Sequence, residues 1–97
     1  MKQIQMKDNI INDISKKQNE ELMTVIFTTK EEKFNYALIC KHTDKFLMVE
    51  MELYKIYPEY LETENYFTAR GNKINKYKTM DQNNIKFSEI IILNQFE

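Results

Sequence analysis

Cys40, His42 and Asp44 follow one another at intervals of two residues, and their side chains could together bind a metal ion. Thiolate, imidazole and carboxylate are all zinc ligands, and an extended strand would place them on one face. A structural zinc site needs four ligands, whereas the chain contains one Cys and one His. A Cys-His nucleophile pair is less favoured still, because side chains on one strand lean in parallel and leave the base without a fixed orientation. We interpret Cys40 as a buried thiol and His42 as a turn residue.

Glu50 and Glu52 form a second candidate pair. Paired carboxylates can act as acid and base, or bind a divalent cation. Two glutamates on the wet face of an amphipathic strand are, however, what solubility alone predicts. The single glycine, Gly71, rules out a glycine-rich phosphate loop. The sequence therefore predicts a protein that is not an enzyme, with no catalytic residues, no metal and no cofactor.

Charged residues are segregated along the chain. Residues 50–65 carry five acids against Lys55, a net charge of −4, interleaved with tyrosines. Tyrosine supplies amphipathic contact area at low entropic cost, and carboxylates orient a basic partner. If this segment binds a protein, the expected contact residues are Tyr54, Tyr57, Glu59, Tyr60, Glu62 and Glu64.

Residues 66–86 carry five bases against Asp81, a net charge of +4. Aromatic rings next to lysines can stack on the bases of single-stranded nucleic acid. The residues expected in that case are Tyr66, Phe67, Arg70, Lys73, Lys76 and Lys78. The single Arg and the net charge of −1 for the whole chain make nucleic acid the less favoured partner. The two charged blocks could also pair with each other or remain solvated.

The elements that must position these residues follow from hydrophobic periodicity. Residues 1–18 have an apolar stripe typical of an amphipathic helix. Residues 22–57 read as a three-stranded meander, with strands at 22–29, 34–41 and 46–57, and the hairpin 34–53 as the centre of the sheet. An acidic connector or short helix (58–65), a hairpin around Gly71 (66–78) and a terminal strand or helix (85–94, with the strand favoured) complete the chain.

The predicted fold is therefore α+β: an N-terminal amphipathic helix packed on an antiparallel sheet of about five strands with two hairpins. Ninety-seven residues, 42% of them hydrophobic, are enough for a single domain. One cysteine fits a reducing compartment, and no apolar run is long enough for a leader or a membrane span. We expect a cytoplasmic protein with no membrane partner, from an A/T-rich genome, since residues with A/T-rich codons are abundant.

The expected function is a small protein-binding module that acts through the acidic, Tyr-rich surface. Its size and composition suggest an inhibitor of the anti-defence type from a phage or mobile element, directed at a host protein or a nucleic-acid-binding protein complex. The alternative is a protein that binds single-stranded nucleic acid, or an accessory of such a protein, using the hairpin 66–78. The sequence leaves a homodimer open, because strand edges and an amphipathic helix both offer surfaces for self-association.

Overall fold

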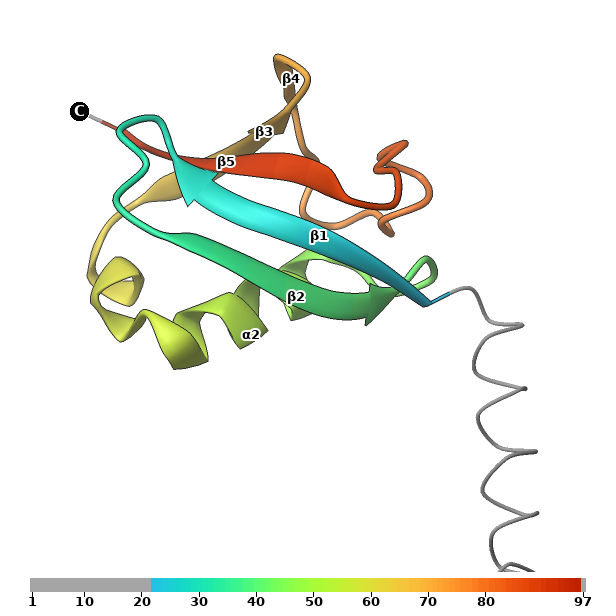
Figure 1. Ribbon diagram of the computed structural model, residues 1–97, viewed down its shortest axis with the longest axis horizontal. Coiled ribbons are helices and arrows are strands. Elements are labelled where there is room, and N and C mark those ends of the chain that lie inside the picture. Colours follow the sequence, from blue (N-terminus) through green and yellow to red (C-terminus); the bar gives the residue numbers. More distant parts are fainter. Residues whose placement is uncertain (1–21, 97) are drawn as a thin grey trace, which may run out of the picture.

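The computed structural model describes residues 22–96, which form one mixed sheet with a helix across one face (Figure 1). The elements in chain order are β1 (Leu22–Thr29), β2 (Asn35–Lys41), α2 (Phe46–Ile56), a 3-10 helix η1 (Pro58–Glu62), β3 (Asn65–Ala69), β4 (Asn72–Lys73) and β5 (Glu89–Gln95). The predicted N-terminal helix over residues 1–18 lies outside the described residues. The α+β class and the five strands agree with the sequence prediction.

The strand order is β2-β1-β5-β3-β4. Strands β1 and β5 run parallel, while the pairs β1–β2, β3–β5 and β3–β4 are antiparallel. The prediction of a wholly antiparallel sheet is therefore wrong. The parallel pair forms because the long connection from β1 to β5 brings the last strand back to the middle of the sheet, a pairing that no local pattern encodes.

The first hairpin confirms two predicted strands. Buried and less buried residues alternate along β1, with Met23, Val25 and Phe27 in the core. In the register of the hairpin, Val25 lies opposite Leu38. The turn between the strands is closed by the Thr29 hydroxyl, which accepts a hydrogen bond from the Lys33 amide at 2.9 Å.

The predicted third strand at 46–57 is wrong, because this segment is the helix α2. Its buried residues are Phe46, Val49, Glu50, Leu53 and Tyr54, which recur at three and four residues as on one face of a helix. The alternating apolar residues that suggested a strand are split between both sides, since Met51 is 43% exposed while Leu53 is fully buried. Leu, Met, Glu and Lys also favour helix over strand. The hairpin 34–53 is thus not the centre of the sheet.

The predictions for the second half of the chain are largely confirmed. Residues Pro58–Glu62 form a short helix, one of the two predicted outcomes. The second hairpin turns at Arg70 and Gly71, both with positive φ (52° and 79°), as a two-residue hairpin turn requires. Its second strand, β4, has only two residues and ends before Ile74, so the hairpin is shorter than the predicted 66–78.

The terminal segment is the strand β5, which was the favoured alternative, and it lies between β1 and β3. Below it, on the side of α2, three phenylalanines from different elements meet. The ring centroids of Phe27 and Phe67 are 5.7 Å apart, and those of Phe46 and Phe67 are 5.1 Å apart. This cluster joins β1, β3 and α2 into one core.

Candidate functional site

Tyr54, the first of the residues expected to bind a protein, lies in the core instead. It is 6% exposed, and its hydroxyl donates a hydrogen bond of 2.6 Å to Oε2 of Glu50. The same hydroxyl accepts a bond of 2.9 Å from the Asn65 amide. Burial, followed by the hydrogen bond to Glu50, raises the pKa of Tyr54. Tyr54 therefore fixes α2 to the start of β3 and is not available to a partner.

The strand interpretation placed Glu50 and Glu52 on one solvent-exposed face, and in the structure they do not share a face. Glu50 is 4% exposed, and its Oε1 lies 3.8 Å from the ammonium of Lys76. Glu52 is exposed and pairs with Lys55 at 2.9 Å on the outer side of α2. One carboxylate is thus structural and the other is a surface group.

Tyr57 and Tyr60 are partly buried against β2. The ring of Tyr57 stacks on Phe34 with centroids 4.3 Å apart, and Tyr60 meets the same ring edge-on at 5.6 Å. Tyr57 also contacts Tyr36 at 6.0 Å. The two tyrosines close one end of the core. The acidic residues predicted to bind a partner together with them, Glu59, Glu62 and Glu64, are exposed.

The structure also divides the residues expected to bind nucleic acid. Phe67 is 2% exposed and belongs to the core. Arg70 forms an ion pair with Glu89 at 3.1 Å, and Lys76 faces the buried Glu50. Lys78 is exposed. Tyr66 and Lys73 of this set are in direct contact, with the Lys73 ammonium 5.5 Å from the centroid of the Tyr66 ring.

The Cys40, His42 and Asp44 triplet does not form a reactive site. Cys40 is buried, as the sequence predicts, and burial, with a smaller effect from Asp44, raises the pKa of its thiol to about 12. Asp44 accepts a hydrogen bond of 2.9 Å from the Lys41 amide and so closes the turn after β2. Within residues 22–96, no three His, Cys, Asp or Glu side chains are placed to hold a metal ion together.

The sheet face opposite α2, which we call the open face, carries a contiguous apolar patch. The patch consists of Ile26, Ala37, Ile39 and Ile90, contributed by three neighbouring strands. Ile26 lies between Ala37 on β2 and Ile90 on β5. Ile39 is two residues after Ala37 on β2, so its side chain is on the same face of the sheet. Ile39 is 69% exposed and Ile90 is 55% exposed. Two large aliphatic side chains are thus presented to solvent where a soluble sheet usually carries polar groups.

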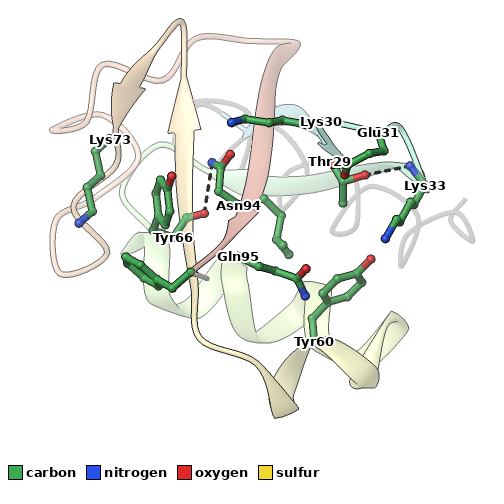
Figure 2. A pocket seen from close by; sticks show the side chains of 11 residues that line it. Thr29, Lys30, Glu31, Lys33, Tyr60, Tyr66, Lys73, Asn94 and Gln95 are labelled. Carbon is green, nitrogen blue, oxygen red and sulfur yellow. Dashed lines mark hydrogen bonds between the residues drawn. The ribbon is translucent and has the colours of Figure 1, made fainter.

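A pocket of about 440 Å³ lies next to the open face, at the end of the sheet where β1 and β5 finish (Figure 2). The turn after β1 supplies Lys30, Glu31 and Lys33, and η1 supplies Tyr60. The remaining lining residues come from the end of β1, from β3 and β4, and from the end of β5 with the residue after it: Thr29, Tyr66, Lys73, Leu93, Asn94, Gln95 and Phe96. The pocket thus brings together one residue predicted to bind a protein, Tyr60, and two predicted to bind nucleic acid.

An aromatic pair forms one wall of this pocket. The rings of Tyr66 and Phe96 have centroids 4.7 Å apart, and the Lys73 ammonium is 5.5 Å and 5.8 Å from the two centroids. Figure 2 shows Lys33 pointing toward the hydroxyl of Tyr60 on the other side of the pocket. Burial, with smaller effects from Glu59, Glu31 and Tyr57, raises the pKa of Tyr60 from an ordinary value that already leaves the hydroxyl a hydrogen-bond donor at neutral pH.

The residues predicted from the sequence to form a binding site do not include Ile39, Ile90, Lys30, Lys33 and Phe96. Ile39 and Ile90 could have been noticed because they are apolar residues at strand positions that alternate with the positions facing the core. The lysines and Phe96 had no such signal, because residues from the turn after β1 and from the chain end meet only through the parallel pairing of β1 with β5.

No known protein family matches this sequence, and no curated protein is similar to it. Among solved structures, the fold is similar to that of a de novo designed protein based on ubiquitin. The TM-score is 0.66 at 12% sequence identity, and the match covers 76% of this chain and 88% of the designed one. The chain therefore has a ubiquitin-like fold. No helix in the described part of the chain is long and apolar enough to cross a membrane.

Proposed function

We propose that this domain is a non-enzymatic protein-binding module that contacts its partner through the open face of the sheet. The observation that supports this most directly is the exposure of Ile39 and Ile90 on the same face of the sheet. Contiguous exposed apolar patches on soluble domains mark interaction sites, because leaving them in water costs free energy that docking recovers.

The acidic, Tyr-rich surface is a weaker candidate for the contact. The centre of a binding surface needs anchors that can be buried by the partner. Tyr54 is already buried, and Tyr57 and Tyr60 pack on Phe34. What remains at that surface is a set of exposed carboxylates and Leu61, which is 57% exposed. These groups supply charge but only one apolar anchor.

The experiment compares the wild-type domain with the double variant Ile39→Glu, Ile90→Glu in affinity capture from lysate of its source cells, with and without nuclease treatment. The matched control is Met48→Glu, Met51→Glu, which adds the same charges to exposed apolar positions on the helix. Circular dichroism and urea unfolding check that all three proteins fold. We expect a protein partner that the wild type and the control retain and the open-face variant loses.

Two outcomes would contradict the proposal. If the open-face variant retains the same partner as the wild type, binding does not use the open face. If capture depends on nucleic acid and vanishes with nuclease, the domain binds nucleic acid and the alternative from the sequence analysis gains support.

A further inference from the structure

We propose that the pocket beside the open face binds carboxylate side chains of an acidic segment in the docked partner. This assignment rests on the proposed function and further specifies that the partner segment is negatively charged. The pocket is one candidate for such contacts because it combines a volume of about 440 Å³ with cationic and hydrogen-bonding groups from four separate parts of the chain.

The charge of the pocket is opposite to that of the chain. Three lysines, Lys30, Lys33 and Lys73, line it against one acid, Glu31, whereas the whole chain has a net charge of −1. None of the three lysines forms an ion pair with another residue in the range 22–96, in contrast to Lys55 and Lys76. The local field therefore favours an anionic ligand that would supply the missing counter-charges.

Hydrogen-bond donors complement these charges. Tyr60, whose pKa is raised, offers a protonated hydroxyl, and Gln95 offers an amide near it in Figure 2. On the other side of the pocket, the Tyr66 and Phe96 rings hold Lys73 above them by cation–π contacts. A carboxylate, which only accepts hydrogen bonds, matches this set of donors.

The pocket and the apolar patch lie in register along β5. Residues of β5 that face away from α2 alternate, so the side chains of Ile90 and Asn94 are on the same side, about 13 Å apart at the usual strand rise. An extended partner segment running along β5 would place an apolar side chain on Ile90 and a side chain four residues away at the pocket. The expected ligand is therefore a segment with an apolar residue and acidic residues about four positions from it.

The apolar patch next to the pocket is the reason to assign carboxylates rather than phosphates. A protein segment that covers Ile39 and Ile90 carries carboxylates as its ordinary acidic groups, whereas phosphate would require a modified residue. Nucleic acid and phosphopeptides are therefore outcomes of the test that would contradict the assignment.

The test uses fluorescein-labelled twelve-residue peptides as probes and fluorescence anisotropy with the full chain. One peptide carries two leucines followed, four residues on, by two glutamates; in the matched peptide, glutamines replace the glutamates. We expect the glutamate peptide to bind about tenfold more tightly, and the difference to shrink as salt is raised. The variant Lys30→Gln, Lys33→Gln should remove this preference, whereas Lys55→Gln, which changes a lysine on the outer side of α2, should not.

The results separate the two proposals. Equal binding of both peptides, with loss of binding in the Ile39→Glu, Ile90→Glu variant, would overturn the carboxylate site while supporting the open face. If neither peptide binds while affinity capture still depends on Ile39 and Ile90, the carboxylate site is likewise overturned and the open face is supported. Tighter binding of a phosphoserine version of the peptide, or of an oligothymidine, through Lys30 and Lys33 would also overturn the assignment.

Discussion

At the scale of single residues, Glu50 shows how position in the fold changes the role of a side chain. A glutamate between Val49 and Met51 reads as a solvated surface group, yet Glu50 is 4% exposed and is held by the Tyr54 hydroxyl and the Lys76 ammonium. A buried carboxylate is tolerated only with such partners, because desolvation otherwise outweighs its interactions. Tyr54 and Lys76 are thus structural partners of Glu50 and do not supply a binding surface.

The same scale gives a prediction for Tyr57. Replacing Tyr57 by Ala removes the ring that stacks on Phe34 at 4.3 Å and contacts Tyr36. We expect a loss of about 2 kcal/mol in the free energy of unfolding, measured by urea denaturation. Tyr77→Ala is the matched control, since Tyr77 is 72% exposed, and should change stability by less than about 0.5 kcal/mol. Equal effects of the two changes would mean that Tyr57 is a surface residue, as the sequence analysis assumed.

At the scale of elements, local pattern was sufficient for most of the sheet. Alternation and β-branched residues predicted β1, β2 and β5, and Gly71 marked the turn of the second hairpin. The segment Phe46–Ile56 failed because its apolar residues satisfy both periods: Val49 and Leu53 are four apart, which suits a helix face and a strand face alike. The burial of Glu50 and Tyr54, which depends on tertiary contacts, separates a helix from a strand here, and the helix propensity of Leu, Met, Glu and Lys is the weaker local signal.

The helix can be tested against the strand by two substitutions. In a strand, Met51 and Leu53 would share a face and respond alike. In α2, Leu53 is fully buried while Met51 is 43% exposed. We expect Leu53→Ala to lower the free energy of unfolding by about 3 kcal/mol and Met51→Ala to change it by less than about 1 kcal/mol, both measured by urea denaturation. Similar losses at both positions would contradict the helix.

At the scale of the whole molecule, the candidate site could be predicted only in fragments. The sequence separated an acidic block from a basic block and assigned a surface to each. The pocket instead combines Tyr60 from the first block, Tyr66 and Lys73 from the second, and two lysines from neither. Pairings between distant segments decide which residues meet, and sequence patterns do not contain them. The cytoplasmic location and the phage or mobile-element origin stay predictions from composition.

Stability of the whole fold should fall in alkaline solution. Burial raises the pKa of Cys40 from its ordinary 9.0 to about 12, and the pKa values of Tyr54 and Tyr60 are raised as well. The unfolded chain then loses these protons at a lower pH than the folded chain does, so the thiol contribution is complete below pH 9 and is lost as pH rises toward 12. Urea midpoints of the reduced protein should decline from pH 9 upward.

The variant Cys40→Ala tests the cause of this decline. It lacks the thiol and should lose less stability between pH 8 and pH 10.5 than the wild type, whatever its stability at neutral pH. An identical decline in both proteins would assign the alkaline sensitivity to other groups.

The central place of β5 has a consequence for synthesis of the protein. Strand β5 is synthesised after the other four strands of this sheet but lies between β1 and β3, and Phe27 on β1 and Ile91 on β5 are both fully buried. A nascent chain that still lacks residues 89–95 presents two separate hairpins with no strand to join them. Folding must therefore wait until β5 has been synthesised, and a premature stop before β5 would leave aggregation-prone apolar strands for degradation instead of a smaller working domain.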